Sequence, residues 1–380
     1  MRRFGQVAAA MGIWALSLTT GCGNFWVYPG SLTSTASNTG DYVYVANQTT
    51  ETLAGYVVGT GTLTAISGLP RTLGFTPTSL VVNPANTMVF VAGTNLGVGY
   101  IDTFQIGSGG VLSLLLTNQV GSADEVSMDV SPDGQWLVGL DANGLTLDEY
   151  QITSTTASTG QLTLGNPETY AFPSGAGSVV PGALKFAPNG NYVYAAEGTA
   201  GDLVVPFTTS GGTWGTPQTL ELASGSGTAD NALAVSSGSG YLYVARSGVN
   251  AGLAVFTISS SNGQLNQVGS TLASGTHPTS VVVNKAGTDI YLANQGTGSI
   301  SEYSVASNGT VAALTPASVT TTSAPWALAV DNSGNYLLAT SQAGSPDLAM
   351  YSYSSGQLVL ATSTATGTDP TGAVALATTH

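Results

Sequence analysis

The sequence predicts an all-β fold, a seven-bladed β-propeller with four-stranded antiparallel blades and a ring closed by pairing of the N- and C-terminal segments. Three observations lead to this prediction. A unit of 47 to 56 residues recurs along the chain, each unit contains short apolar strands separated by tight turns, and the two ends of the chain together supply one more unit. A period of about 40 to 50 residues with four strands per unit is typical of a propeller.

Each unit starts with Pro or an acidic residue, continues through small residues and an apolar run, and turns into a Tyr-Val-Ala-like strand. The units begin at Pro77, Glu125, Pro181, Asp230, Pro278 and Pro325. The centre of the second strand lies 13 residues later in every unit, at Phe90, Val138, Tyr194, Tyr243, Tyr291 and Leu338. This constant offset defines the first hairpin, whose turn carries residues such as Asp133-Gly134 that accept the positive φ of a tight turn.

The two ends of the chain account for the seventh blade. Residues 41–76 contain the strand Tyr42–Asn47 and two later strands but lack the first strand of the unit. Residues 371–376 have the sequence of that missing strand. We therefore expect six whole blades and one blade shared between the termini, which closes the ring without a free sheet edge.

The composition restricts the partners of the protein. Charged residues make up 7% of the chain, so Ser, Thr, Asn and Gly must keep the surface soluble. Six basic and 20 acidic residues give a formal charge of −14, and loss of Arg2 and Arg3 would leave four basic residues and a charge of −16. Such a surface repels nucleic acid and anionic lipid headgroups, so we expect no nucleic-acid partner.

The N-terminal segment is expected to be a lipoprotein-type signal peptide over residues 1–21, followed by a flexible tether over 22–40 and the propeller over 41–380. Two arginines precede an apolar stretch, residues 7–18, that is shorter than the ~20 residues a membrane-spanning helix needs. Thr19-Thr20-Gly21-Cys22 resembles a lipobox, with Leu18 one place further upstream than usual, so lipidation is expected at Cys22. The alternative is an incidental cysteine. The protein is thus expected to be exported and held on a membrane, in the periplasm or at the cell surface.

The second strands also resemble a known family. Tyr44-Val45-Ala46-Asn47 and Tyr291-Leu292-Ala293-Asn294 are similar to the YVTN-type propeller repeat. The wider pattern, over about residues 41–380, resembles the seven-bladed lactonase-like family, which includes 6-phosphogluconolactonases. The resemblance implies the propeller fold and, as an activity, hydrolysis of a sugar lactone.

The sequence differs from that family at the positions that carry the family's lactone-opening residues. In the family one blade begins Pro-Arg-His and its second strand ends Asn-Glu, residues implicated in binding and opening a lactone. The nearest match here is Pro181-Gly182-Ala183, with the strand ending Ala196-Glu197-Gly198. Gly182 and Ala183 thus replace the Arg and the His, and whether the protein is an enzyme is left open.

Ionisable residues gather at two kinds of loop that a propeller places on one face, the loop before each first strand and the loop after each second strand. The candidates for binding a ligand or cation are Asp124, Glu125, Asp141, Asp230 and Asp369, and the weaker candidates for catalysis are Glu197, Arg246 and His277. Converging carboxylates raise one another's pKa or require a counter-ion. Calcium is the cation that an oxygen-only site outside the cell would favour, and no other cofactor is expected. The alternative is that loops hold charges because strands bury their side chains.

Two classes of function follow from these observations. The favoured interpretation is a binding or cell-surface scaffold module whose small-molecule, glycan or protein ligand meets the channel mouth, because the Arg-His pair is missing. The alternative is a lactonase-like hydrolase acting on a sugar lactone, in which Glu197, Arg246 and His277 replace the family's acid and base groups.

Membrane fractionation tests the predicted anchor. A diacylglyceryl group on Cys22 buries CH₂ groups worth ~0.8 kcal/mol each, so the wild-type protein should sediment with membranes. Cys22→Ser is expected to release it into the soluble fraction. Identical fractionation of the two proteins would mean that Cys22 is not the anchor.

Overall fold

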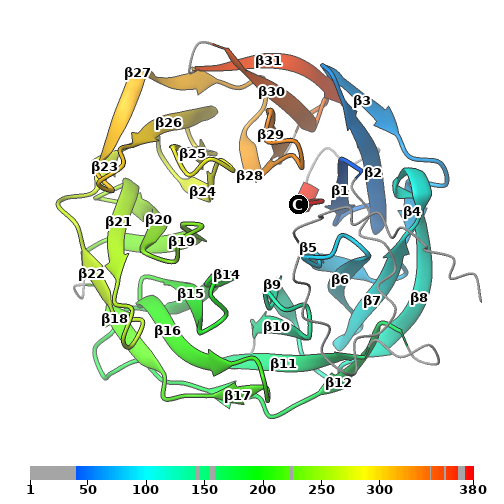
Figure 1. The fold of residues 1–380 in the computed structure, drawn as a ribbon, viewed down its shortest axis with the longest axis horizontal. Coiled ribbons are helices and arrows are strands. Elements are labelled where there is room, and N and C mark those ends of the chain that lie inside the picture. The colour runs from blue at the N-terminus through cyan, green and yellow to red at the C-terminus, as the bar shows by residue number, and fades with distance from the viewer. Residues whose placement is uncertain are drawn as a thin grey trace, which may run out of the picture. The chain divides into compact units, whose positions relative to one another are not determined.

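The computed structural model describes residues 40–380 except 143–144, 154–158, 223–225, 343, 355–356 and 367–372. Residues 1–39, which include Cys22 and the predicted leader, lie outside the described part, as does Asp369. The described residues form a ring of β-sheets around a central channel (Figure 1). No helix within these residues is long and apolar enough to cross a membrane.

The ring has seven blades of four main antiparallel strands, and the outermost strand of some blades is broken into two short pieces. Blade 1 contains β32 (Ala373–Thr378), β1 (Tyr42–Asn47), β2 (Thr52–Gly59), β3 (Thr62–Ala65) and β4 (Arg71–Thr72). Blade 2 contains β5 (Thr76–Val82), β6 (Met88–Asn95), β7 (Val98–Ile106), the 3₁₀ turn η1 (Ser108–Gly110) and β8 (Leu112–Gln119). Blade 3 contains β9 (Glu125–Val130), β10 (Trp136–Asp141), β11 (Thr146–Thr153), β12 (Gln161–Leu164) and β13 (Glu168–Thr169).

The remaining blades repeat this order from the channel outward. Blade 4 contains β14 (Val179–Phe186), β15 (Tyr192–Gly198), β16 (Gly201–Thr208), β17 (Thr213–Trp214) and β18 (Gln218–Glu221). Blade 5 contains β19 (Thr228–Val235), β20 (Tyr241–Gly248), β21 (Gly252–Ile258), β22 (Leu265–Gln267) and β23 (Leu272–Ala273). Blade 6 contains β24 (Pro278–Val283), β25 (Asp289–Asn294), β26 (Ser299–Val305) and β27 (Val311–Thr320). Blade 7 contains β28 (Pro325–Val330), β29 (Tyr336–Ser341), β30 (Leu348–Ser354) and β31 (Gln357–Thr364).

The predicted fold is confirmed, including the blade shared between the termini. Strand β32 pairs antiparallel with β1, with Tyr44 opposite Ala377 and Val45 opposite Leu376. The hydroxyl of Thr379 adds two contacts to this seam, because it accepts the N–H of Tyr42 at 2.9 Å and donates to the carbonyl of Gly40 at 2.8 Å. The C-terminal strand therefore supplies the innermost strand of blade 1.

The hydrophobic core lies between the blades. Seven buried clusters occur, and each joins two adjacent blades, so that every blade packs against both of its neighbours around the ring. The centres of the seven second strands are at most 2% exposed, namely Tyr44, Phe90, Val138, Tyr194, Tyr243, Tyr291 and Leu338. The period-two pattern of each strand thus serves two interfaces, with alternate side chains facing the two neighbouring blades.

The innermost strands expose one edge to the channel, and side chains of the neighbouring blade satisfy several of its backbone groups. Ser127 accepts the N–H of Leu184 at 3.0 Å, and Ser280 accepts the N–H of Leu328 at 3.1 Å. The carboxylate of Asp129 accepts the N–H of Phe186 at 2.8 Å. These bonds pair donors that would otherwise be orphaned at a sheet edge.

Removal of residues 370–380 tests the role of closure. The deletion strips β1 of its partner strand and exposes the cluster that joins blades 7 and 1. We expect the thermal midpoint to fall by roughly 10 °C or more, measured by calorimetry. Removal of His380 alone leaves β32 intact and removes only the bonds of His380 to Asn86 and Val82, so this control should lower the midpoint much less. An unchanged midpoint in the longer deletion would contradict closure by β32.

Candidate functional site

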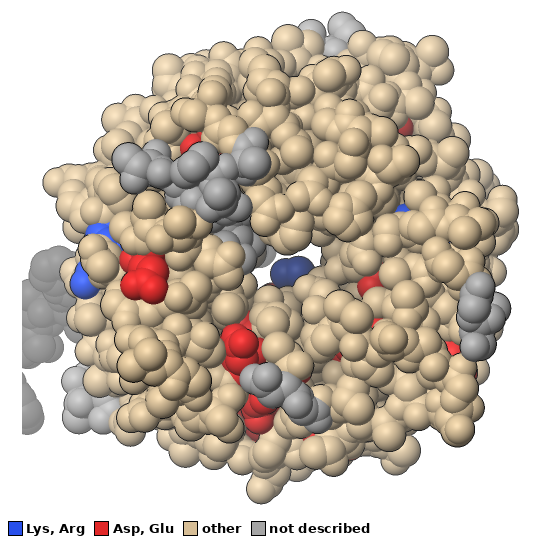
Figure 2. All heavy atoms as spheres, turned by 180° about the vertical axis from the view of Figure 1, so that it is seen from behind, with Lys and Arg blue, Asp and Glu red and all other residues tan. Residues whose placement is uncertain are grey.

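The second strands of all seven blades end on one face of the propeller, which we call the charged face. The residues three places beyond the strand centres lie there, namely Asn47, Gly93, Asp141, Glu197, Arg246, Asn294 and Ser341. Those of blades 3, 4 and 5 are ionisable, and the first strands bring Glu125 opposite Asp141 and Asp230 opposite Arg246. Figure 2 shows acidic side chains next to the opening of the central channel.

A buried ion pair connects the first two strands of blade 5. Arg246 Nε donates to Asp230 Oδ1 at 2.6 Å, and Nη2 donates to Oδ2 at 2.9 Å. The side chains are 6% and 0% exposed, so the pair is shielded from water and the guanidinium plane is held by two parallel bonds. Gly198 at the end of β15 pairs with Asp230, which brings blade 4 into direct contact with this pair.

Asp202 is the least expected residue of the site. Asp202 is in β16 and lies opposite Ala196 of β15. The other six blades have a buried Leu or Ile at the corresponding position of the third strand. Those residues are Leu53, Ile101, Leu147, Leu253, Ile300 and Leu348. Asp202 is fully buried, and no donor among the described residues reaches its carboxylate oxygens, so its side-chain hydrogen bond to Asp230 requires one of the two carboxyls to be protonated. Burial, and next the Asp230 carboxylate, raise the pKa of Asp202 well above its ordinary value, against the opposing effect of Arg246.

Glu197 is the second carboxyl of this group. Its Oε1 accepts the hydroxyl of Tyr170 at 2.6 Å, whereas Oε2 is buried without a partner in the described part of the chain. Burial raises the pKa of Glu197 to about 7, although the Tyr170 hydrogen bond acts in the opposite direction. A carboxyl with this pKa is poised to exchange a proton at neutral pH. We call Glu197, Asp202, Asp230 and Arg246 the blade 4–5 network.

Blade 3 holds a separate acidic group. Tyr150 donates its hydroxyl to Glu125 Oε1 at 2.6 Å, and Glu125 Oε2 has no partner among the described residues. Burial and the neighbouring Asp148 raise the pKa of Glu125 well above its ordinary value. Gly139 makes room for this carboxyl, because a Cβ there would lie 2.1 Å from Glu125 Oε2. Burial and Asp141 likewise raise the pKa of Asp124.

The central channel is a cavity of about 950 Å³ lined by the first strands of the blades. In β14 the register shifts between Val179, opposite Gly198, and Ala183, opposite Ala196. Residues 180–182 form the resulting bulge and line the channel. The bulge therefore lies on the strand between Glu197 and the channel, and it shields the blade 4–5 network from that side.

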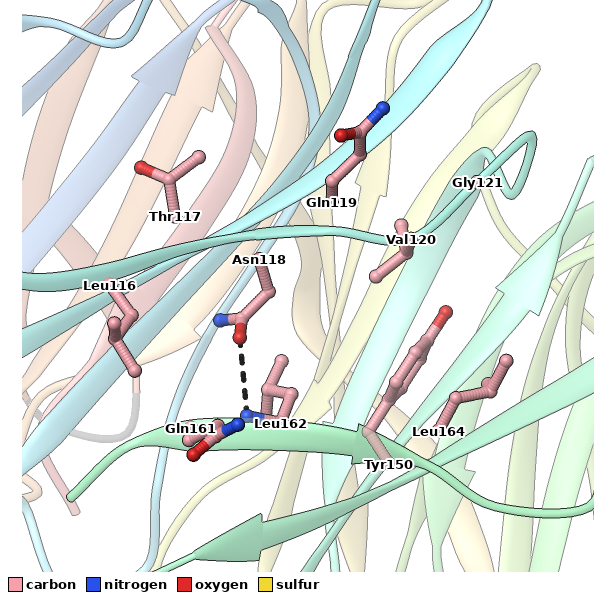
Figure 3. A pocket seen from close by; sticks show the side chains of 10 residues that line it. All are labelled: Leu116, Thr117, Asn118, Gln119, Val120, Gly121, Tyr150, Gln161, Leu162 and Leu164. Carbon is pink, nitrogen blue, oxygen red and sulfur yellow. Dashed lines mark hydrogen bonds between the residues drawn. The ribbon is translucent and has the colours of Figure 1, made fainter. Parts of the chain in front are cut away.

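A second cavity shares Tyr150 with the blade 3 acidic group but none of its carboxyls. Its volume is about 640 Å³, and it lies between β8 and β12 of blades 2 and 3 (Figure 3). Asn118 Oδ1 accepts the N–H of Leu162 across it at 3.3 Å. The lining residues include no Asp, Glu, His, Lys or Arg, so this cavity offers no acid or base apart from the phenol of Tyr150.

The structure brings only some of the predicted site residues together. Arg246 and Asp230 form an ion pair in blade 5, and Asp202 interacts electrostatically with both of them and with Glu197 of blade 4. In blade 3, Glu125 lies opposite Asp141. His277 is exposed and lines the channel in blade 6. Asp230 is bound by Arg246 through both carboxylate oxygens and so is not free to complete a ring of acids with Asp124. No group of three or more His, Cys, Asp or Glu side chains among the described residues is placed to hold a metal ion.

Sequence reasoning missed Asp202 and Tyr170. Asp202 could have been found by aligning the third strands, since the other six units have Leu or Ile at its position. No sequence pattern marks Tyr170. It follows the short strand β13 of blade 3, and the folded ring brings its hydroxyl to Glu197 of blade 4.

Comparisons with known proteins agree with the fold. Residues 35–314 match the family model described as "Lactonase, 7-bladed beta-propeller". The periplasmic gluconolactonase of Pseudomonas aeruginosa is similar in structure, with a TM-score of 0.71 and 16% identity over 90% of this chain and 99% of that one. A protein from Lactobacillus plantarum has a TM-score of 0.72 and 17% identity over 90% of this chain and 100% of its own. No curated protein sequence matches the chain.

Replacing Asp202 by Leu, the residue type of the other blades, is expected to stabilise the propeller by about 1–4 kcal/mol, since exchanging buried ionic groups for apolar ones is often favourable. Because burial raises the pKa of Asp202, the folded state favours the protonated carboxyl, and that stability is lost as pH rises above about 4 toward the folded pKa. The gain in Asp202→Leu should thus be larger at about pH 8 than at about pH 4 in thermal unfolding.

The control is Glu221→Gln, which removes the same charge from an exposed position. It should leave both the midpoint and its pH dependence unchanged. A midpoint for Asp202→Leu below that of the wild type at about pH 8 would contradict the idea that Asp202 costs stability.

Proposed function

Because the chain belongs to the seven-bladed lactonase family, we propose that it is a hydrolase acting on a neutral sugar lactone, with the blade 4–5 network as its acid–base centre. The observation that carries the proposal is the fully buried Glu197, whose Oε2 has no partner among the described residues and whose neighbour Gly198 pairs with Asp230 of the buried Asp230–Arg246 ion pair. Burial also raises the pKa of Glu197 to about 7. Structural cores do not need such a group, and Asp202 adds a stability cost that function would explain.

Hydrolysis of a lactone needs three things that these residues can supply. As a carboxylate, Glu197 takes a proton from the water that attacks the carbonyl carbon. Arg246, whose guanidinium is oriented by Asp230, stabilises the negative charge that develops on the carbonyl oxygen. Protonated Glu197 then returns its proton to the ring oxygen as the carbon–oxygen bond breaks, which leaves an open-chain hydroxy acid.

The chain cannot use the arginine of the family's Pro-Arg-His segment. Gly182 occupies that place, and a Cβ there would lie 2.3 Å from the backbone carbonyl oxygen of Asn231. Blade 5 thus takes the space that a side chain at 182 would need. Arg246 belongs to blade 5 as well. The proposal requires its guanidinium to take the role of the family's arginine.

Substrate access depends on the bulge at residues 180–182. Glu197 and Asp202 are fully buried, so a lactone in the channel meets them only when the bulge moves. Val180 in this bulge is 57% exposed. The same burial favours a second candidate function, the non-catalytic binding module expected from the sequence, in which the channel binds a ligand and the network stays closed.

A neutral lactone suits the propeller better than a phosphorylated one. Of its four basic residues, Arg246 is paired with Asp230, and Lys185 lies 3.6 Å from Asp129. Arg71 lies over the Phe104 ring, and Lys285 bonds to Asn332. Within the blade 4–5 network the only cation is Arg246, which Asp230 already pairs, so a phosphate dianion there would lack a free counter-charge. The proposal includes export through the predicted leader and anchoring at Cys22, as membrane fractionation would test.

Hydrolysis of glucono-1,5-lactone above its spontaneous rate is the direct test, with 6-phosphogluconolactone as the disfavoured substrate. Glu197→Gln is expected to lower kcat by about 100-fold or more, since it removes the acid–base group. Wild-type kcat/KM should rise with pH through about 7 as Glu197 loses its proton, and the variant should lack this rise.

Arg246→Lys, which keeps a charge beside Asp230, should lower kcat through loss of the planar guanidinium.

Glu221→Gln serves as the charge-matched control and should turn over at the wild-type rate. If the wild type does not exceed the spontaneous rate, or if Glu197→Gln matches it, the hydrolase proposal fails. Ligand binding without turnover would then favour the binding module.

A further inference from the structure

The second strands of blades 6, 7 and 1 end on the charged face in uncharged polar residues, and we call this part the amide-rich part. In blades 6, 7 and 1 the second strands end in Asn294, Ser341 and Asn47, and each of these residues is followed by a glutamine. Gln295 Nε2 donates to Gln342 Oε1 at 2.6 Å and joins the loops of blades 6 and 7, while Gln48 of blade 1 lines the channel. The opening is thus ionic over blades 3 to 5 and rich in amides over blades 6, 7 and 1.

Trp326 belongs to blade 7, within this amide-rich part. It is the second residue of β28, it is partly buried, and it lines the central channel. The other two tryptophans in the described part have structural roles, since Trp136 Nε1 donates to the Thr209 carbonyl at 2.8 Å and Trp214 Nε1 donates to the Asn166 carbonyl at 3.0 Å. The indole of Trp326 makes no hydrogen bond or ring contact to the described residues, although its backbone carbonyl accepts Thr279 Oγ1 at 2.8 Å. An aromatic face and an N–H donor are therefore left facing the cavity.

His277 lies on the neighbouring blade, two residues before Thr279, and lines the same channel. Its φ is +53°, a left-handed conformation that a residue other than glycine rarely adopts, and it precedes Pro278. None of the described residues at the corresponding place before the other first strands has a positive φ. The backbone N–H of Gln295 holds the turn by donating to the His277 carbonyl at 3.1 Å. The left-handed turn therefore sets the direction in which the His277 side chain leaves the loop.

We propose that Trp326 and His277 form a binding subsite for a neutral pyranose ring at the channel opening of blades 6 and 7. The C–H face of such a ring is apolar and fits the indole, whereas its hydroxyls point outward. The Trp326 N–H, the His277 imidazole and the Gln48 amide lie around the same cavity to meet those hydroxyls. A cavity of about 950 Å³ is within the size range of ligand sites.

This inference deepens the proposed function and rests on it only for the choice of a lactone as ligand. The ring would be held by blades 6 and 7, and its carbonyl would face the blade 4–5 network. The subsite can equally exist in a protein that binds sugars without hydrolysing them.

Calorimetric titration with glucono-1,5-lactam, a neutral ring that does not hydrolyse, tests the subsite. Trp326→Ala should weaken lactam binding at least about tenfold, and Trp326→Phe should retain most of it because an aromatic face remains. His277→Gly should also weaken binding while keeping or raising the thermal midpoint, since glycine tolerates a positive φ. Saturation-transfer NMR should place the C–H face of the lactam against an aromatic ring in the wild type and in Trp326→Phe, but not in Trp326→Ala. Leu164→Ser, at the far outer rim, is the control.

The outcomes separate the two proposals. Lactam binding that is lost in Trp326→Ala supports the subsite even if no lactone is hydrolysed. Hydrolysis with wild-type kcat/KM in Trp326→Ala overturns the subsite and leaves the hydrolase intact. Failure of the wild type to bind the lactam, or equal binding by wild type and Trp326→Ala, also overturns the subsite.

Discussion

Packing between neighbouring blades is the interaction on which the rest of the structure depends. A single four-stranded sheet cannot shield both of its faces from water, and each blade here does so only because apolar side chains of two neighbours cover it. The seven interfaces follow one another around a closed ring. The pairing of β32 with β1 completes that ring, so no blade is left with an uncovered face. Charge is therefore excluded from most of each strand and is confined to strand ends, loops and the few positions where a specific partner exists.

This constraint makes the blade 4–5 network informative. A carboxyl at a position that is Leu or Ile in six blades lowers the stability of the interface that holds the ring together. Asp202, Glu197 and Asp230 all share that interface, with one arginine among them. The repeat provides an internal reference for each position, and at the position of Asp202 only blade 4 departs from the aliphatic residue of the other blades.

The division of the charged face follows from the same architecture. Each blade presents the same two loops to the opening, so the character of the opening changes blade by blade with the residues at two or three positions. Blades 3 to 5 carry carboxyls and a guanidinium there, and blades 6, 7 and 1 carry amides, a tryptophan and a histidine. A neutral polar ligand could meet both parts at once, which a uniformly acidic opening would not allow.

The sequence by itself determined the fold, because a propeller repeats one local pattern and the offset of 13 residues between unit start and strand centre recurs in every unit. It also placed Glu197, Arg246 and Asp230 on one face, since strand ends follow from the strands. The tertiary structure decided which of these groups meet. The Gly198–Asp230 pairing joins blades 4 and 5, and the Tyr170 hydroxyl reaches Glu197 from a different blade. It also separated His277 from the acids and buried Asp202, because contacts between blades depend on the angle and depth of packing, which no pattern within one unit encodes.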